Sequence, residues 1–200
     1  MLRIAIVIGS TRPGRQARDV GEWVLDRARS RGDADYQILD LADFDLPLLD
    51  EPGAAAMTQD YAHPHTRAWS EAVASFDGYV FVTPEYNHST TAALKNALDY
   101  LFVEWNNKAA GFVGYGLQGG VRAVEHLRLI VAELHVADVR SQVALSLFHD
   151  FSAHGLRPQP HHEQTLQRML DQLLTWAGAL RAVRGLPQTE DPVTREAAAG

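Results

Sequence analysis

Polar and aromatic side chains directly follow an apolar run at residues 78–82, in the sequence TPEYNHS at residues 83–89. An apolar run that ends at a proline predicts a buried strand opening into a loop. Within this loop, a fixed backbone, an aromatic face and an amide come from Pro84, Glu85, Tyr86 and Asn87. A flat heterocycle needs such a surface to lie against, with polar groups at its edge. The alternative is an ordinary loop with a capping asparagine.

The first apolar run, residues 2–8, also opens into a polar loop, GSTRPGRQ at residues 9–16. A helix is expected to begin within this loop, and the free N–H groups and dipole at a helix N-terminus favour a bound anion. Arginine adds bidentate, charge-assisted hydrogen bonds to phosphate oxygens. The loop therefore predicts a phosphate site formed by Ser10, Arg12, Arg15 and Gln16. The alternative is that Ser10 or Thr11 caps the helix and that both arginines are solvated.

The glycine spacing of this first loop argues against two common nucleotide-binding motifs. Only Gly9 and Gly14 are present, so the G-x-G-x-x-G pattern of dinucleotide-binding folds is missing. The Gly-Lys-Ser/Thr of a Walker A loop is missing as well. A single phosphate on a mononucleotide is the better fit.

Composition restricts the class of protein further. The chain has 200 residues, 46% hydrophobic and 22% charged, which is ordinary for one globular domain with its own core. Its net charge of −7 argues against a nucleic-acid binder, which normally carries a basic face. The absence of cysteine excludes disulfides, thiolate catalysis and cysteine-ligated metals. Because no apolar run approaches the ~18 residues that span a bilayer and the N-terminal run is too short for a signal peptide, we expect no membrane partner and a cytoplasmic location.

Apolar runs alternate with helical patterns along the chain, which is typical of βαβ units and a parallel sheet. The expected strands are residues 2–8, 36–40, 78–83, 109–115 and 138–145, and the expected helices are residues 15–29, 65–75, 91–102, 121–134 and 165–184. This alternation predicts an α/β fold, a flavodoxin-like, doubly wound three-layer sandwich with strand order 2-1-3-4-5. We expect this domain to occupy residues 1–186. Residues 187–200 lack periodicity and predict a disordered tail.

The predicted strand order brings the two polar loops together. Right-handed crossovers place helices on both faces of the sheet, and the order reverses between the first and third strands. In open sheets of this kind, ligands bind at that reversal, beyond the carboxyl ends of the strands. The two loops follow these two strands, so we expect them to bind one ligand between them.

Three segments resemble the NADPH-dependent FMN reductases of the flavodoxin-like superfamily, which include quinone, chromate and azo-dye reductases. The segments are GSTRPGRQ, TPEYNHS followed by ALKNALDYL, and VGYGLQGGVRAVEHLR at residues 113–128. With the βα alternation, the resemblance extends over roughly residues 2–180. The chain departs from the family at Gly114, where a serine is often found, and at Ala92 and Ala93, where Pro-Gly is often found.

The resemblance implies an NAD(P)H-dependent oxidoreductase that binds FMN. It assigns the FMN phosphate to Ser10, Arg12, Arg15 and Gln16. It sets the isoalloxazine ring against Pro84, Glu85, Tyr86 and Asn87, with Tyr115 and Gly116 lining the far side. Members of the family are usually dimers or tetramers, and a neighbouring subunit often helps to close the flavin site. A homodimer or homotetramer is therefore expected.

The same resemblance implies that the chemistry takes place at N5 of FMN. Hydride from NADPH or NADH would pass through the flavin to a small oxidant such as a flavin or a quinone. No catalytic side chain and no metal ion are then expected, because the cofactor supplies the reactivity. A flavodoxin-type electron carrier is the alternative, although carriers tend to be strongly acidic and monomeric. A non-catalytic module that has lost flavin is a third reading, which the presence of Ser10, Arg12 and Asn87 argues against.

A few other polar residues have ordinary interpretations. Lys95 and Asp99 are four residues apart on an expected helix, which predicts an ion pair. Arg122 and Glu125 are expected either in contacts between subunits or on a solvated helix face. The histidine pairs at residues 63 and 65 and at residues 161 and 162 do not match metal-site spacing, and we expect them to be solvated loop residues.

Overall fold

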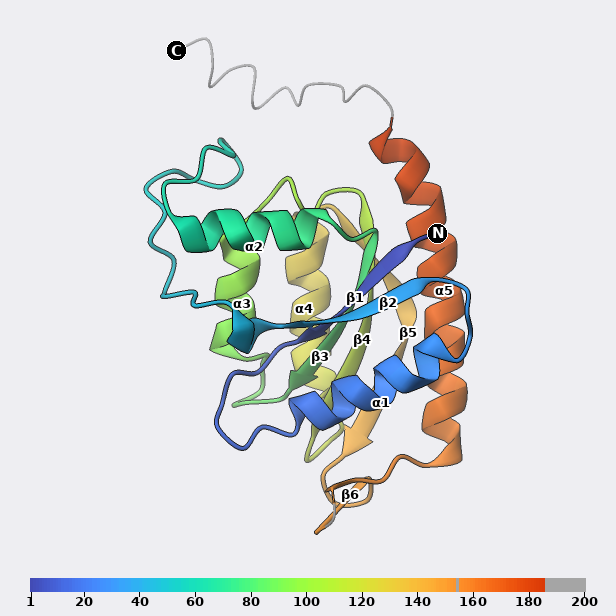
Figure 1. Ribbon diagram of the computed structural model, residues 1–200. Coiled ribbons are helices and arrows are strands. Elements are labelled where there is room, and N and C mark those ends of the chain that lie inside the picture. The colour runs from blue at the N-terminus through green and yellow to red at the C-terminus, as the bar shows by residue number, and fades with distance from the viewer. Residues whose placement is uncertain (154, 186–200) are drawn as a thin grey trace.

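The computed structural model describes residues 1–153 and 155–185 and contains a five-stranded parallel sheet (Figure 1). The strands are β1 (Arg3–Ile8), β2 (Asp35–Asp40), β3 (Gly78–Pro84), β4 (Lys108–Gly116) and β5 (Val136–Ser146). Neighbouring strands pair in parallel, in the order β2-β1-β3-β4-β5. The predicted fold class and strand order are confirmed.

Helices cover both faces of this sheet (Figure 1). One face carries α1 (Ala17–Arg29) and α5 (Pro160–Arg184), and the other carries α2 (Pro64–Ala74), α3 (Ala92–Asp99) and α4 (Val121–Glu133). A 3-10 helix, η1 (Leu41–Asp43), follows β2, and a small hairpin of β6 (Phe151–Ser152) and β7 (Gly155–Leu156) precedes α5. Among the described residues, no helix combines the length and the apolarity that crossing a membrane requires.

Alternating side chains of the sheet build one core on each face. On β1, Ile4, Ile6 and Ile8 pack toward α1 and α5, whereas Ala5 and Val7 pack toward the other three helices. Every residue of β3 is buried. A central parallel strand is covered on both faces, which explains why its sequence is continuously apolar rather than alternating.

Apart from shifts of one or two residues at other element ends, the structure differs from the expected elements mainly at three places. α5 begins at Pro160 rather than at residue 165, because proline suits the first helical position and Gln159 forms a capping box with His162. α3 ends at Asp99 rather than at residue 102, since the chain then turns and buries Leu101 and Trp105. The β6–β7 hairpin was not expected, because two-residue strands leave no periodic pattern. The tail expected at residues 187–200 lies outside the described residues.

A buried lysine joins the sheet to α2 at the edge where β4 begins. The Lys108 ammonium donates hydrogen bonds to the carbonyl oxygens of Val73 (2.9 Å) and Ala74 (3.3 Å) and to the Tyr79 hydroxyl (2.9 Å). A cation is favourable there because the last carbonyls of a helix carry partial negative charge. Burial, and next the positive charge of Arg184, lower the pKa of Lys108 to about 7, although Asp77 and Glu104 oppose the shift.

We expect Lys108 to make the stability of the protein rise with pH. The unfolded chain holds the lysine proton up to a pKa of about 10.4, whereas the folded protein releases it above about 7. Between these values, this group should add about 1.4 kcal/mol to the free energy of unfolding per pH unit. Urea unfolding at pH 6 to 9 should show the wild type gaining stability relative to Lys108→Met. The exposed Lys95, replaced in the same way, is the control, and a difference that stays constant with pH for Lys108→Met would contradict the prediction.

Candidate functional site

A pocket of about 190 Å³ lies where the loops after β1, β3 and β4 meet. Its lining residues are Arg12, Gln16, Pro84, Glu85, Tyr86, Tyr115, Gly116 and Leu147. Seven of these eight were predicted from the sequence as site residues, and only Leu147 was not. The two polar loops therefore line one pocket, where the predicted strand order places them; that this pocket is the binding site stays a prediction.

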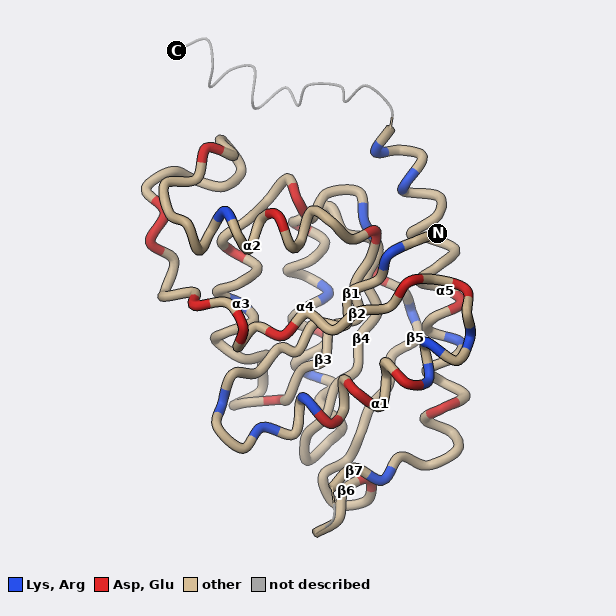
Figure 2. Tube along the Cα trace, in the orientation of Figure 1, with Lys and Arg blue, Asp and Glu red and all other residues tan. Residues whose placement is uncertain are grey.

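A buried carboxylate holds the first loop in place. Asp40, the last residue of β2, is almost inaccessible and accepts hydrogen bonds from Arg15 (2.7 Å) and Arg18 (3.3 Å). Arg15 is therefore not simply solvated, which was one alternative for this loop. Arg12 is exposed, and its guanidinium carbon lies 5.7 Å from the centre of the Tyr86 ring. Basic residues along this loop stand out in Figure 2.

The start of α1 offers hydrogen-bond donors rather than a capped end. Gln16 occupies the N-cap position, and among the described residues its side chain caps no backbone N–H. Ser10 is not the cap either; its hydroxyl lies 3.3 Å from the Tyr86 hydroxyl. The buried Nε of Arg15 has no hydrogen-bond partner within the described part of the chain. Buried donors are normally paired, so this end of the pocket suits an anion that accepts several hydrogen bonds.

The second loop is a tight turn that closes directly above β3. Tyr86 and Ser89 exchange backbone hydrogen bonds of 2.9 and 3.2 Å, and Asn87 and His88 between them have φ angles of 49° and 75°. Two successive left-handed residues are typical of a type I′ turn, and asparagine tolerates this conformation. The turn directs Asn87 to solvent, and this residue does not line the pocket.

The third loop, residues 114–120 at the end of β4 and before α4, folds back closely on the end of that strand. A Cβ atom on Gly114 would lie 2.9 Å from the carbonyl oxygens of Gly119 and Gly120, and Gly120 has a φ of 70°. A serine at residue 114, which the resemblance led us to expect, would therefore clash here. Burial, and next the nearby Tyr86, raise the pKa of the Tyr115 phenol, although Arg12 and Arg15 oppose the shift. Tyr115 thus belongs both to the third loop and to the surroundings of the first.

Glu85 forms an ion pair with Arg122 of α4. Its buried carboxylate accepts a hydrogen bond of 2.6 Å from Arg122 Nε and one of 3.1 Å from the Arg122 backbone N–H. Burial by itself raises the pKa of Glu85, but its hydrogen bonds and ion pair with Arg122 outweigh this effect and lower it. The sequence left Arg122 on a solvated face or in contacts between subunits; the structure adds the ion pair with Glu85 while the Arg122 side chain stays 38% exposed, and the contact between subunits stays a prediction.

Two residues of the site escaped sequence reasoning. Asp40 ends a predicted strand, but nothing local indicates that its carboxylate meets Arg15, 25 positions earlier. Leu147 lies just beyond β5, and its N–H donates to the Gly116 carbonyl oxygen (3.0 Å). The register that pairs Gly116 with Ser146 was the one signal that could have placed Leu147 beside the pocket.

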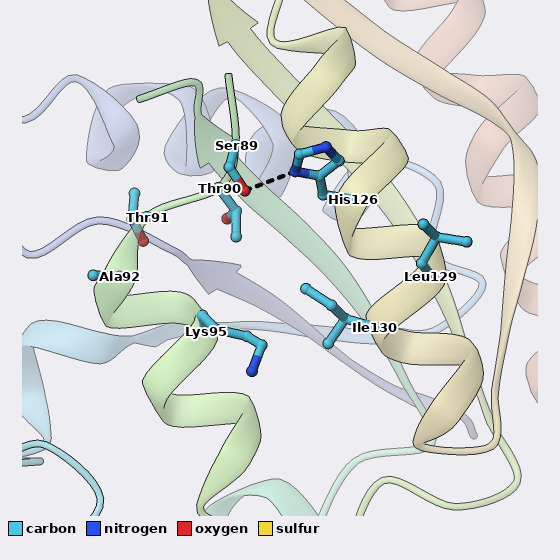
Figure 3. Close-up of a pocket in the computed structure, with 8 residues that line it drawn as sticks. All are labelled: Ser89, Thr90, Thr91, Ala92, Lys95, His126, Leu129 and Ile130. Atoms are coloured by element: carbon cyan, nitrogen blue, oxygen red, sulfur yellow. Dashed lines mark hydrogen bonds between the residues drawn. The ribbon is translucent and has the colours of Figure 1, made fainter. Parts of the chain in front are cut away.

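A second hollow of about 470 Å³ lies between α3 and α4, beside the second loop (Figure 3). Ile130 and Leu129 of α4 and Lys95 of α3 line it, and the Leu129 side chain is 75% exposed. The hollow continues from the turn through Ser89, whose hydroxyl contacts His126 Nδ1 at 2.9 Å. The predicted ion pair of Lys95 with Asp99 is present at 2.6 Å. We call this hollow the α3–α4 groove.

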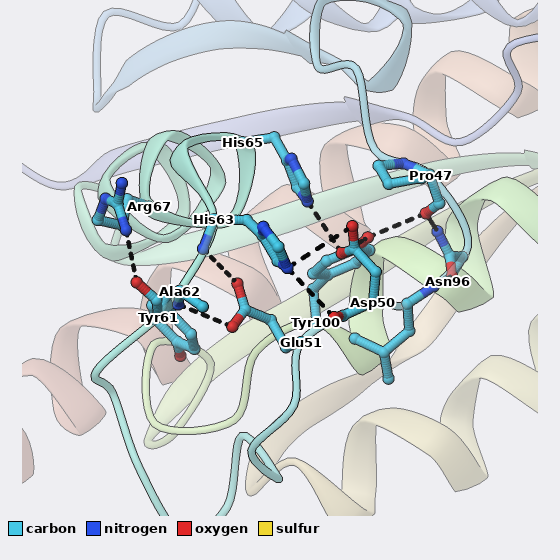
Figure 4. Close-up of polar contacts among 11 residues, drawn as sticks. Pro47, Asp50, Glu51, Tyr61, Ala62, His63, His65, Arg67, Asn96 and Tyr100 are labelled. Atoms are coloured by element: carbon cyan, nitrogen blue, oxygen red, sulfur yellow. Dashed lines mark hydrogen bonds and ion pairs between the residues drawn. The ribbon is translucent and has the colours of Figure 1, made fainter.

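The histidine pairs make more contacts with other residues than the sequence predicted. His63 and His65 stack with ring centres 5.1 Å apart, and both approach the Asp50 carboxylate, His65 at 3.0 Å (Figure 4). His162 is buried, and its Nδ1 accepts a hydrogen bond from the Gln159 backbone. These side chains link neighbouring segments, since a histidine beside a carboxylate or a helix N-terminus finds a partner there. His161 is exposed and the His63 side chain is 38% exposed, whereas His65, His161 and His162 lie in α2 and α5 rather than in loops, which corrects the expectation of loop residues.

Known proteins resemble this chain in sequence and in fold. The family model for NADPH-dependent FMN reductase matches residues 2–150. An NAD(P)H-dependent FMN reductase of Nectria sp. is 45% identical over 128 residues, which is 62% of this chain and 64% of that relative. A 2-hydroxy-1,4-benzoquinone reductase of Burkholderia sp. is 29% identical over 188 residues, 88% of this chain and 96% of that relative. A flavoenzyme NAD(P)H:(acceptor) oxidoreductase of Paracoccus denitrificans shares the fold, with a TM-score of 0.70 at 20% identity over 90% of this chain and 98% of its own.

Removing the Asp40 carboxylate should destabilise the protein. Asp40→Ala leaves the largely buried Arg15 without its partner, and hydrogen bonds to charged groups contribute about 1.5–3 kcal/mol each. We expect the free energy of unfolding, measured in urea, to fall by about 2 kcal/mol. Asp45, an exposed carboxylate on the following loop, is the matched control, and Asp45→Ala should change stability by less than ~0.5 kcal/mol. Equal effects of the two variants would refute the role given to Asp40.

Proposed function

The chain belongs to the NADPH-dependent FMN reductase family and is an FMN-dependent oxidoreductase, and we propose that its pocket binds FMN and passes electrons from NAD(P)H to a small oxidant. The FMN phosphate would lie at the start of α1, against Ser10, Arg12, Arg15 and Gln16. The isoalloxazine ring would lie against Pro84, Glu85 and Tyr86, with Tyr115 and Gly116 lining the far side of the pocket. Asn87 stays assigned to the ring as a prediction, although it faces solvent in the isolated chain.

One observation carries this proposal: a single pocket joins an anion-binding end to an aromatic-walled end. Arg12 and Gln16 line one end, and Tyr86, Tyr115 and Gly116 line the other. The unpartnered Nε of Arg15, within the described residues, and the open first turn of α1 supply donors that a phosphate would use. The fit of these residues to FMN is therefore good on chemical grounds.

In this reaction, the role of the protein is to position the flavin ring. Bound FMN would accept a hydride from NAD(P)H and deliver the electrons to an oxidant. Pro84 and the turn after it give the ring a fixed surface, and Gly116 lets the opposite backbone approach closely. A Cβ on Gly116 would lie 3.2 Å from the Cβ of Glu85. Glu85 is bound to Arg122, so it has no role as a general acid or base in this scheme.

A flavodoxin-type carrier remains the alternative. A carrier needs only to exchange electrons with protein partners, whereas a reductase must admit NAD(P)H and an oxidant to the ring. The match to a reductase family over residues 2–150 favours the enzyme. The net charge of −7 is also mild for a carrier.

The expected homodimer or homotetramer has a suitable surface in the α3–α4 groove. The groove is mostly apolar and starts at the loop that lines the pocket, so a second copy seated there would stand beside the flavin. The pocket of one chain, about 190 Å³, is smaller than the ~300–1,000 Å³ of typical small-molecule sites. A partner subunit would provide the missing enclosure. The cytoplasmic location stays a prediction from the N-terminal sequence.

We propose further that the oxidant is apolar and aromatic, such as a quinone. Leu117 and Phe148 are 62% and 70% exposed, and Leu147 between them lines the pocket. These three residues follow the paired ends of β4 and β5, so they form one apolar rim beside the site. Exposed apolar patches of this kind mark binding surfaces. The benzoquinone reductase named among the relatives acts on a substrate of this class.

The visible absorption spectrum tests the proposed function. Adding FMN to the purified protein, followed by anaerobic NADPH, should give a bound flavin band that bleaches. Arg12→Ala should weaken FMN binding about tenfold, because a charge-assisted hydrogen bond to phosphate is lost. Arg168→Ala, an exposed arginine on α5, is the control. A band that does not bleach would favour the carrier, and no bound flavin would refute the proposal.

The apolar rim should select among oxidants. The double variant Leu117→Ser/Phe148→Ser should raise the KM for 1,4-naphthoquinone about thirtyfold, since each side chain contributes burial energy on the order of 1 kcal/mol. The rate with ferricyanide, a small charged oxidant, should not change. Trp176→Ser, a half-exposed aromatic residue on α5, is the control. Equal losses with both oxidants would show that the rim does not recognise the quinone.

A further inference from the structure

We propose that Glu85 is a positioning residue that fixes the width of the slot between the second and third loops, and that it does so by capping α4. This inference rests on the proposed function, because the slot is the place given to the isoalloxazine ring. It concerns how the protein shapes that slot before any ligand binds.

Glu85 touches the third loop at three successive points. Its backbone N–H donates to the Tyr115 carbonyl oxygen (3.0 Å), which extends the β3–β4 pairing by one residue. Its Cβ faces Gly116, where an added Cβ would lie 3.2 Å away. Its carboxylate then reaches Arg122 beyond the glycines of the loop. One side chain therefore spans the third loop from the end of β4 to the start of α4.

The carboxylate replaces the cap that α4 lacks. The N-cap residue is Gly120, which has no side chain to accept the free N–H groups of the first turn. The N-cap must be small here, because a Cβ on Gly120 would lie 2.5 Å from the backbone nitrogen of Tyr115. Glu85 supplies the missing acceptor from a different loop and bonds the Arg122 N–H at 3.1 Å. A negative charge at a helix N-terminus is also favoured by the helix dipole.

The Arg122 side chain also binds the Glu85 carboxylate, from the side that faces solvent. Its Nε donates to Glu85 at 2.6 Å while its side chain stays 38% exposed, against 5% for Glu85. The backbone and side chain of one arginine thus hold a single carboxylate, which fixes both the orientation of Glu85 and the start of α4. Among the described residues, Glu85 is the acidic residue that lines the pocket. Its negative charge therefore stands beside the ring position, balanced by Arg122.

The test compares Glu85→Gln, Arg122→Ala and the double variant by titration with FMN. Each single change should weaken FMN binding about tenfold, because each removes the same interaction between Glu85 and Arg122. The double variant should bind no worse than the weaker single variant, since a shared interaction is lost only once. Glu125→Gln removes an exposed carboxylate on the same helix and should bind FMN as the wild type does. Unchanged affinity, or losses that multiply in the double variant, would overturn the proposal.

The reduction potential of the bound flavin distinguishes a positioning role of Glu85 from a purely structural one. The bound flavin gains negative charge on reduction, so Glu85→Gln should raise its midpoint potential, whereas Glu125→Gln should not. Hydrogen exchange of the FMN-free protein provides a readout that does not depend on flavin. Backbone amides at residues 117–123 should exchange faster in Glu85→Gln than in the wild type. If the wild type bound no FMN, the proposed function would be refuted, but hydrogen exchange would still test whether Glu85 caps α4 through Arg122. Unchanged exchange in Glu85→Gln would refute that capping role.

Discussion

The pairing of β1 with β3 in the middle of the sheet determines where every part of the site lies. Ile8 stands opposite Val82 in this pairing, and the next residue, Gly9, donates its N–H to the Val82 carbonyl oxygen at 2.8 Å. A Cβ on Gly9 would lie 2.7 Å from that same oxygen, so glycine permits the approach. The Thr91 hydroxyl donates to the Gly9 carbonyl oxygen and also caps α3. A backbone hydrogen bond and the Thr91 side chain thereby tie the end of β1 to β3 and to the start of α3.

The charged residues around the pocket leave hydrogen-bond donors available there, although the protein as a whole is acidic. Two carboxylates on the loops and strands around the pocket, Asp40 and Glu85, are both buried and both paired with arginine. Each one organises a loop: Asp40 holds the first, and Glu85 joins the second to the third. Because their charges are balanced locally, the open helix end and Arg12 can attract an anion despite the net charge of −7. If the pocket binds FMN as proposed, stability and ligand binding depend on the same ion pairs.

Much of the fold and most of the site could be predicted because they depend on local pattern. Apolar runs and helical periodicity identified five strands and five helices, and their alternation led to the observed sheet order. The order then brought the two polar loops to one edge, and seven predicted residues line one pocket there. The β6–β7 hairpin and the early start of α5 were missed, since strands of two residues and one turn of helix leave too little pattern to detect.

The sequence by itself determined the kinds of side chain at the site and the strands that carry them. The tertiary structure decided which distant groups those side chains meet. Arg15 pairs with Asp40, and Glu85 pairs with Arg122, across 25 and 37 positions of the chain. Asn87 has the expected residue type but faces solvent, because the tight turn of the second loop directs it there. Periodicity reflects which face of an element is buried, whereas a specific ion pair or turn depends on distances that exist only once the sheet has formed.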